Sequence, residues 1–113
     1  MTVKILLERK FKEDPSLEDI RVINAMRIAA MQRRGYVSGE TLVDIDDHKR
    51  ILVISVWINK SSWDAWLRSG ERQRIEADLD KSLKQPPMVR WFMLGADYLS
   101  EVFDEVVHES EIS

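Results

Sequence analysis

Three tryptophans and one arginine are the residues of this chain whose types and spacing could serve a reaction. Trp57 ends an apolar run, and Trp63 and Trp66, three residues apart, would share one face of a helix. Indole rings form apolar walls, and an indole N–H can donate a hydrogen bond to an anionic oxygen. Arg9 interrupts an apolar alternation, and a buried guanidinium must be paired or face a ligand. These residues would suit a cavity for an aromatic ligand, and it is equally open that the tryptophans simply fill the core.

Three further polar residues are candidates for contact with a ligand. Asn59 follows the third apolar run, and Glu71 and Arg72 follow a break in the helical pattern. A base or a hydrogen-bond donor from this group would stabilise an anionic substrate.

Arg9 also has an interpretation that involves no ligand. If the chain forms a dimer, Glu8 or Glu40 of the second copy could pair with Arg9 across the interface. The sequence leaves both interpretations open.

The composition is that of one ordinary globular domain. The chain has 113 residues, of which 44% are hydrophobic and 33% are charged, so it can bury a core without a disulfide or a structural metal. It carries 17 basic and 20 acidic side chains, a balance that argues against a dedicated nucleic-acid binder. The absence of cysteine excludes disulfide scaffolds, thiolate zinc sites and cysteine nucleophiles.

The sequence contains no targeting or membrane signal. The apolar run 3–7 is too short for a signal peptide, and no stretch is long enough to cross a bilayer. We therefore expect a cytoplasmic protein that does not bind membranes. The acidic cluster from Asp44 to His48 could offer ligands to a cation, but it lacks ligand spacing and is expected to be a loop.

Apolar periodicity and turn residues predict four strands and several helices. A first strand begins at Val3 and ends by Lys12, and Asp14 and Pro15 start a helix that Gly35 ends. The remaining predicted elements are strands 36–43 and 50–58, a short helix 62–67 capped by Ser61, a helical stretch that follows a break at Gly70 and is stopped by Gln85, strand 88–94, and a helix from Tyr98 to Val107 capped by Asp97.

This order predicts an α+β fold, the ferredoxin-like βαββαβ sheet, with an extra C-terminal helix. We expect a domain of residues 1–95 and a C-terminal helix and tail of residues 96–113. The strands 50–58 and 88–94 are apolar on both faces, whereas helices can cover only one face of such a sheet. The other face is expected to meet the same face of a second copy, which gives a homodimer. The stripe of the C-terminal helix is expected to dock on its own subunit or on the partner; it consists of Tyr98, Leu99, Val102, Phe103, Val106 and Val107.

Several segments resemble the antibiotic biosynthesis monooxygenase family. They are the run from Arg50 to Trp57, the later Trp63, the segment from Trp66 to Ser69, and the segment from Pro86 to Phe92, with a further match at 35–42. The resemblance covers about residues 2–94. It implies a dimeric α+β barrel in which two ferredoxin-like sheets face each other, with a pocket between the sheet and the helices of each subunit.

The quinone-forming members of that family are similar to this chain at Trp57. They carry an asparagine where this chain has Val53 and a tyrosine where it has Trp63. The aromatic residue is therefore kept, and the polar residues that orient the substrate are absent.

The haem-degrading members are similar at Trp66. They carry a helix histidine where this chain has Glu76, and another group carries one near Glu71. Haem iron needs an axial donor, and the two histidines of this chain, His48 and His108, lie in a turn and in the tail. We expect no haem, flavin or metal cofactor.

Two functions follow from these observations, and the sequence does not decide whether the protein is an enzyme. The first is a cofactor-independent monooxygenase acting on a small aromatic or cyclic metabolite. Its expected site has Trp66 and Arg9 in catalytic roles, and Trp57, Trp63, Asn59, Glu71 and Arg72 in contact with the substrate. The alternative is a non-catalytic dimeric module that binds a hydrophobic ligand or a protein partner. An open cavity with a charged group inside would favour the enzyme, and a filled one would favour the module.

Overall fold

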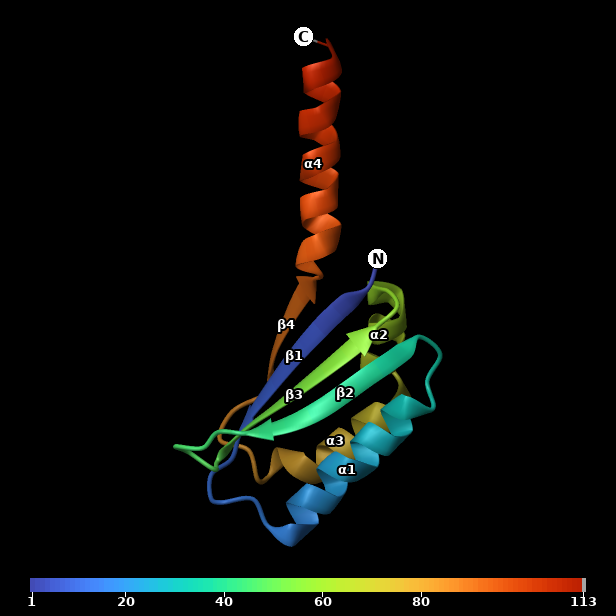
Figure 1. Cartoon of the computed structure of the whole chain (residues 1–113). Coiled ribbons are helices and arrows are strands. Elements are labelled where there is room, and N and C mark those ends of the chain that lie inside the picture. Colours follow the sequence, from blue (N-terminus) through green and yellow to red (C-terminus); the bar gives the residue numbers. More distant parts are fainter. Residues whose placement is uncertain (113) are drawn as a thin grey trace.

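The computed structural model of the chain describes the backbone of residues 1–112 and the side chains of residues 1–100 and 102–104. That part of the chain forms one sheet and four helices (Figure 1). The elements are β1 (Val3–Lys10), α1 (Leu17–Met31), β2 (Tyr36–Val43), β3 (Arg50–Trp57), α2 (Lys60–Leu67), α3 (Gly70–Asp80), β4 (Met88–Met93) and α4 (Gly95–Ile112).

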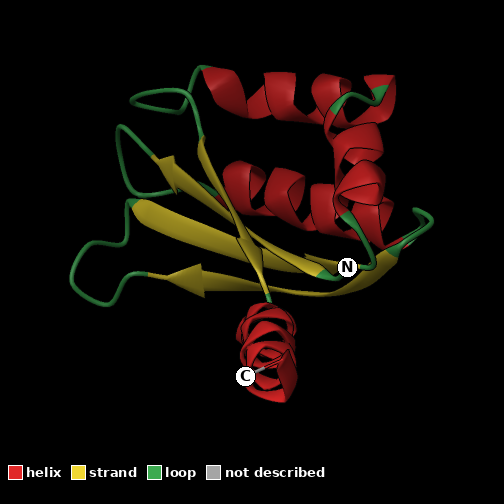
Figure 2. Cartoon of the chain, turned by 90° about the horizontal axis from the view of Figure 1, so that it is seen from above, coloured by secondary structure: helices red, strands yellow, loops and turns green. Residues whose placement is uncertain are grey.

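The sheet is antiparallel and has the strand order β2-β3-β1-β4. Helices α1 and α3 lie side by side over one of its faces, as Figure 2 shows from above. This arrangement is the ferredoxin-like α+β fold, and it confirms the predicted fold class. The strand order also places the first and third strands at the centre of the sheet, where both edges of each strand are paired.

Alternation along β1 decides which side chains face the helices. Leu7 pairs with Val53 of β3, and Arg9 pairs with Ile51, so these four side chains share one face. Because Ile51 is fully buried on that face, Arg9 must also lie beneath the helices. The exposed fraction of its side chain is 2%.

The hydrophobic core lies between the sheet and its two covering helices. Its buried members are Val3, Ile5, Leu7, Phe11, Val22, Ile23, Met26, Ala29, Ala30, Ile51, Trp57, Trp63, Trp66, Leu79 and Leu83. Three of the four tryptophans are among them. The fourth, Trp91 of β4, is half exposed.

Helix α1 begins two residues later than the sequence predicts. Its N-cap is Ser16, whose hydroxyl accepts from the Asp19 N–H while the Asp19 carboxylate accepts from the Ser16 N–H. This reciprocal capping box satisfies two backbone donors, which explains why it prevails over Asp14. The C-cap is Gln32, and the predicted C-cap Gly35 lies beyond it with a φ of 91°.

Helices α2 and α3 also differ from the prediction at their ends. Asn59 caps α2 by accepting from the Ser62 N–H at 2.9 Å, so the predicted cap Ser61 lies inside the helix. Helix α3 ends at Asp80, and Leu83 lies beyond it, where it forms an isolated bridge with Phe11.

The acidic segment between β2 and β3 is a loop, as predicted. One carboxylate oxygen of Asp44 accepts from the N–H groups of Asp46 and Asp47, which is turn geometry. Within the described residues, no cluster of three or more His, Cys, Asp or Glu side chains could hold a metal ion.

The second face of the sheet is not covered by any helix in the described part of the chain. Its apolar side chains come from all four strands and are Leu6, Leu42, Leu52, Ile54, Val56, Met88 and Phe92. We call this set the open sheet face. Its apolar character matches the prediction of two apolar faces on the third and last strands.

Helix α4 projects away from the rest of the molecule (Figure 1), and the chain measures 62 Å along its longest axis. Leu99 and Phe103 are each about two-thirds exposed. The predicted helix is present. The expectation was that its stripe docks on its own subunit or on the partner: the described side chains of the stripe do not pack on their own subunit, and docking on a partner stays a prediction. The side chains of Val106 and Val107 lie outside the described residues.

Hydropathy along the described helices gives no candidate for a membrane span, since none is both long enough and apolar enough.

Candidate active site

A small cavity lies between the sheet and the helices, where the resemblance implies a pocket. Its volume is about 50 Å³, and its lining comes from β1, β2, β3 and all three helices that precede β4. Ordinary small-molecule pockets measure about 300–1,000 Å³, so this one is nearly filled by side chains. It nevertheless contains the residues that the sequence singles out: Arg9, Trp57, Trp63, Trp66 and Arg72 all line it.

The tryptophans serve both as core and as cavity wall. Trp57 is fully buried and packs edge-on against Tyr36 and Trp63, with ring centroids 5.4 and 5.9 Å apart. The Trp57 N–H donates to the Ser55 hydroxyl at 2.9 Å, whereas the N–H of the 3% exposed Trp63 is buried without a hydrogen-bond partner among the described residues. Unpaired buried donors are rare in native proteins, so the Trp63 N–H is the donor of the wall that a ligand could satisfy.

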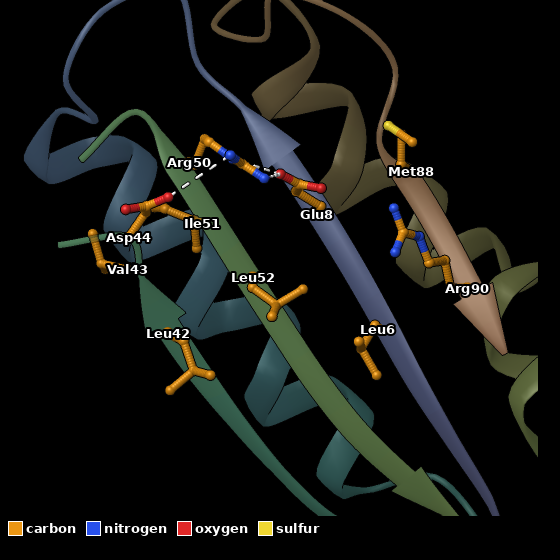
Figure 3. Close-up of a pocket in the computed structure, with 10 residues that line it drawn as sticks. All are labelled: Leu6, Glu8, Leu42, Val43, Asp44, Arg50, Ile51, Leu52, Met88 and Arg90. Carbon is orange, nitrogen blue, oxygen red and sulfur yellow. Dashed lines mark hydrogen bonds and ion pairs between the residues drawn. The ribbon is translucent and has the colours of Figure 1, made fainter. Parts of the chain in front are cut away.

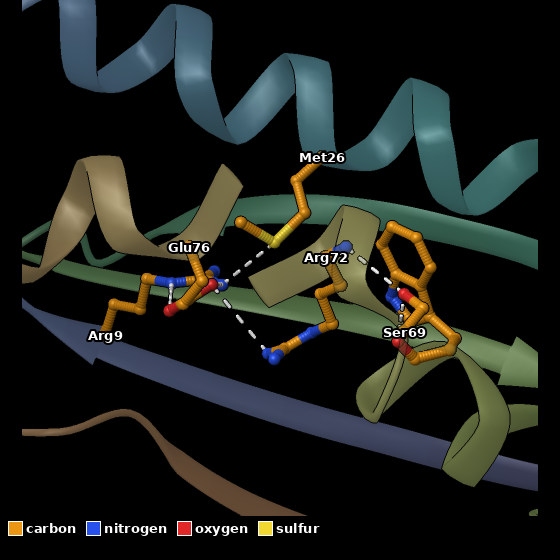
Figure 4. A network of polar contacts seen from close by, with 6 residues as sticks. Arg9, Met26, Ser69, Arg72 and Glu76 are labelled. Atoms are coloured by element: carbon orange, nitrogen blue, oxygen red, sulfur yellow. Dashed lines mark hydrogen bonds and ion pairs between the residues drawn. The ribbon is translucent and has the colours of Figure 1, made fainter. Parts of the chain in front are cut away.

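Arg9 is held by a carboxylate of its own chain (Figure 4). Its Nε donates to Glu76 Oε1 at 3.1 Å and its Nη2 donates to Glu76 Oε2 at 2.5 Å. Nη2 also contacts Met26 Sδ at 3.3 Å. Such a two-point contact is the strong form of an arginine–carboxylate pair, and it fixes the guanidinium plane beneath the sheet.

Arg72 is the second buried arginine of the cavity, and it is held more loosely. Its Nη2 lies 3.8 Å from Glu76 Oε2, beyond hydrogen-bond distance, and its guanidinium lies 6.0 Å from the ring centroid of Trp63. Burial lowers the pKa of Arg72 below its usual value; the Glu76 carboxylate opposes this shift, and the charge of Arg9 adds to it. Two guanidinium groups thus share a single buried carboxylate, which leaves one positive charge in excess.

Two predicted site residues lie away from the cavity. Asn59 caps α2 and borders a shallow surface hollow, and Glu71 is exposed in the first turn of α3. Both residues lie at helix N-termini. An N-cap side chain accepts from free backbone N–H groups, and an acidic residue in the first turn interacts favourably with the helix dipole.

The interpretation of Arg9 as an interface residue is wrong. Glu8 lies on the open sheet face, where the Nε and Nη2 atoms of Arg50 contact its Oε1 at 2.7 and 2.6 Å. Glu40 pairs in register with Ile54, a residue of that same face. Arg9 lies on the opposite face with Glu76, so it is not available for pairing across the sheet.

Glu76 is the functional residue that the sequence analysis does not identify as part of the site. The resemblance places a histidine of haem-degrading proteins at this position, which was one signal. The spacing of Arg72 and Glu76, four residues apart on one helix, was a second signal. Nothing in the sequence alone connects Glu76 to Arg9, because 67 residues separate them.

A second, larger hollow of about 350 Å³ lies on the open sheet face (Figure 3). Apolar side chains such as Leu6 and Leu52 form its floor, and the Arg50–Glu8 pair closes one end. The hydrogen bond to Glu8 raises the pKa of Arg50 above its usual value. This hollow is a surface feature of the face expected to meet a second copy, and it holds none of the predicted site residues.

The sequence profile of the family described as "Antibiotic biosynthesis monooxygenase" matches residues 12–78, more than half of the chain. The chain belongs to the antibiotic biosynthesis monooxygenase family. No curated protein matches it.

Solved structures agree with membership in this family at the level of the fold. A conserved protein of Methanosarcina mazei is 12% identical, with a TM-score of 0.75 over 81% of this chain and 91% of its own. SnoaB, a cofactor-independent oxygenase from Streptomyces nogalater, is 15% identical, with a TM-score of 0.74 over 82% of this chain and 92% of its own. Rv0793 from Mycobacterium tuberculosis is 14% identical, with a TM-score of 0.74 over 83% of this chain and 95% of its own. At these identities the likeness shows the fold alone.

Proposed function

We propose that this protein is a cofactor-independent monooxygenase that acts on a small aromatic or cyclic metabolite in the cavity beneath the sheet. One observation carries the proposal: a tryptophan-walled cavity is bordered by two buried guanidinium groups that share one carboxylate. An excess positive charge in an apolar site favours a substrate in its anionic form. Family membership and the fold shared with SnoaB support the same chemistry.

The proposed reaction needs no redox cofactor because the substrate supplies the electrons. A phenol loses its proton, and the electron-rich phenolate reacts with dioxygen at a ring carbon that bears hydrogen. One oxygen atom is then retained as the quinone carbonyl and the other leaves as water, so phenol and dioxygen give quinone and water. The protein contributes stabilisation of the anion and exclusion of bulk water.

The residues divide these tasks among themselves. Arg9 and Arg72 supply the positive charge, and Glu76 positions both guanidinium groups. Trp66, which is 3% exposed, forms part of the wall against which a ring would pack. Core residues on the sheet and helix sides of the cavity limit the access of water, and a bound ring would close the rim.

A ring-sized substrate requires the cavity to expand. Met26 is the side chain best suited to this movement, because it is unbranched, lines the cavity and contacts Arg9 only through sulfur. We therefore expect binding to displace the Met26 side chain while the Arg9–Glu76 pair stays in place.

Oxygen consumption by the purified protein tests the proposal. With a panel of reduced polycyclic phenols and no added cofactor, the protein should consume dioxygen at a rate proportional to its concentration. Trp66→Phe and Arg9→Ala should lower that rate at least tenfold, and Arg68→Ala, which removes an exposed arginine outside the cavity, should not. If no phenol of the panel consumes oxygen above the uncatalysed rate, the enzyme proposal fails.

The alternative function is a non-catalytic dimeric module that binds a hydrophobic ligand or a protein partner. The cavity volume of about 50 Å³ and the two-point pairing of Arg9 favour it, because both are features of a filled core. Binding of aromatic ligands without oxygen consumption would support this alternative.

The proposal includes a homodimer that works in the cytoplasm without a bound haem, flavin or metal. The support for the dimer is the open sheet face, whose apolar side chains come from all four strands. A Soret band that decays on addition of a reductant would contradict the cofactor statement.

A further inference from the structure

We propose that Arg72 and the N–H of Trp63 bind a single anionic oxygen group, and that the occupant is an aromatic monoanion such as an aryl carboxylate or a phenolate. The inference rests on the proposed function for the identity of the cavity as the substrate site. It goes further by naming the charge of the ligand and the two donors that recognise it.

The charge of the cavity lining sets the charge of the ligand. Its charged lining residues are Arg9, Arg27, Arg72 and Glu40. Glu76 does not line the cavity, but its carboxylate lies behind the lining, against Arg9 and Arg72. Arg27 and Glu40 are exposed at the rim, so solvent screens them, whereas Arg9 and Arg72 are buried. The two buried guanidinium groups and the Glu76 carboxylate leave a balance of one positive charge, which one negative charge on a ligand would neutralise.

Arg72 and Trp63 are the donors that remain free for a ligand. Arg72 lies 3.8 Å from its carboxylate, and the Trp63 N–H is buried without a partner among the described residues. The guanidinium lies over the face of the Trp63 ring, 6.0 Å from its centroid, and the N–H lies at the edge of that ring. Both groups line the same cavity, so an anionic group at this ring edge could accept from both. A bound anion would thus satisfy the one buried side-chain donor that has no partner among the described residues.

Arg9 has a different role in this arrangement. Two of its nitrogen atoms are engaged by Glu76, and Met26 covers Nη2 as well. Arg9 therefore fixes the Glu76 carboxylate, which in turn holds Arg72 beside Trp63. We assign Arg9 and Glu76 as positioning residues, with Arg72 and Trp63 as the groups that touch the ligand.

The walls of the cavity select an aromatic ligand over a small inorganic anion. Trp57, Trp63 and Trp66 line one cavity with Leu7 and Ile23, and such a lining gains free energy by burying a ring. A small inorganic anion would meet the same charge but would leave these rings without a partner.

Anaerobic titration calorimetry with benzoate tests the inference separately from the proposed reaction. Benzoate should bind the wild-type protein. Benzamide, which is its neutral isostere, should bind at least tenfold more weakly. Nitrate should also bind more weakly than benzoate. Arg72→Met should weaken benzoate binding at least tenfold. Trp63→Phe, which removes the N–H and keeps a ring, should weaken it severalfold. The matched control is Arg68→Met, which removes the same charge from an exposed site and should leave the affinity unchanged.

The variant Glu76→Gln separates charge recognition from a purely structural role. It raises the buried excess charge from one to two, so benzoate should bind more tightly than to the wild type. Weaker binding of benzoate to Glu76→Gln than to the wild type would show that the excess charge does not set recognition, and would overturn the inference as well.

Three results would overturn the inference: equal binding of benzoate and benzamide, unchanged affinity in Arg72→Met, or tighter binding of nitrate than of benzoate. Absence of any benzoate binding to the wild type would overturn it too. Because no oxygen is present, a protein that binds benzoate but oxidises no phenol would keep this inference while the proposed function fails.

Discussion

At the scale of single residues, the buried triad of Arg9, Glu76 and Arg72 is the most informative feature of this chain. A buried guanidinium is costly unless it is paired, and here one carboxylate serves two of them. The pairing is unequal, since Arg9 makes two hydrogen bonds to Glu76 and Arg72 makes a longer ion pair. The two arginines should therefore contribute differently to stability.

We predict that Arg9→Met lowers the free energy of unfolding by about 3 kcal/mol, the usual cost of breaking a buried pair. Arg72→Met should leave the free energy of unfolding unchanged or raise it. Burial lowers the pKa of Arg72, so folding disfavours its charged form, and a methionine there would leave the neutral Arg9–Glu76 pair intact. Urea denaturation at pH 7 measures both effects. Equal destabilisation by the two substitutions would show that Arg72 is a structural brace.

The sequence predicts part of this site, for reasons that these residues make clear. Arg9 stands out because it breaks the apolar alternation of a strand, and alternation is a local property. Trp63 and Trp66 follow from helical spacing in the same way. Glu76 could not be assigned as the partner of Arg9, because that contact depends on how α3 lies across β1. Asn59 was placed in the site by its position after a strand, and it instead caps the next helix.

At the scale of elements, the start of α1 shows how a helix end is chosen and stabilised. The Asp19 carboxylate accepts from the Ser16 N–H at 3.0 Å and from the Ser82 hydroxyl at 2.9 Å. Burial acts to raise its pKa, but these hydrogen bonds, with the Ser16 hydroxyl and the charge of Lys81, lower the pKa below its usual value. The cap therefore also ties α1 to the segment that follows α3.

We predict that Ser16→Ala lowers the free energy of unfolding by about 1 kcal/mol, because it removes the hydroxyl from the capping box. Asp19→Asn should lower it at pH 7 as well. The pKa of Asp19 is lower in the folded state, so its contribution is present above the unfolded value of about 3.9 and is lost as the pH falls through the lower folded value. Denaturation of the wild type and of Asp19→Asn between pH 7 and pH 2 should show that the difference between their free energies of unfolding shrinks at the acid end. A difference that stays constant would contradict this role.

The elements were predicted better than their ends. The bounds of β2 agree with the prediction, and β3 and β4 each end one residue earlier, because alternation and turn residues mark strands locally. Helix ends depend on which polar side chain reaches the free N–H groups. The N-cap of α1 is Ser16 and not Asp14, and the N-cap of α2 is Asn59 and not Ser61. In both places several neighbouring residues could have accepted from the same N–H groups, so the sequence does not decide between them.

At the scale of the whole molecule, the open sheet face calls for a partner. Ile54 and Leu6 pair at the middle of this face, and charged pairs such as Arg50 with Glu8 flank it. An apolar centre with a polar rim is the usual pattern of a protein interface. A second copy of the chain supplies the same face, and two sheets stacked in this way would enclose the exposed apolar residues.

We predict that the protein sediments at micromolar concentration with twice its mass of 13.2 kDa. Ile54→Glu should convert it to a folded monomer, because the change puts a charge at the centre of the interface and away from the core. The matched control is Ile45→Glu, in a loop where the side chain is 90% exposed, and it should leave the dimer intact. A wild-type monomer would contradict the barrel arrangement.

Helix α4 projects away from the sheet and its covering helices (Figure 1), and its described apolar side chains are largely exposed. It continues from β4, an edge strand that contributes Met88 and Phe92 to the open sheet face, so dimerisation would bring a second copy close to its base. Three large apolar side chains of α4, Tyr98, Leu99 and Phe103, are each more than half exposed. We expect the second copy to cover part of this apolar surface.

Truncation after Asp97 should therefore raise the dissociation constant of the dimer severalfold. It should leave the unfolding of the Ile54→Glu monomer unchanged, because α4 projects away from its own domain. Sedimentation equilibrium of the full-length and truncated chains measures the first effect, and thermal unfolding of the two monomeric variants measures the second. The comparison separates the two places where the helix could act. An unchanged dissociation constant would exclude docking of α4 on the partner. A lower melting temperature of the truncated monomer would show docking of α4 on its own subunit.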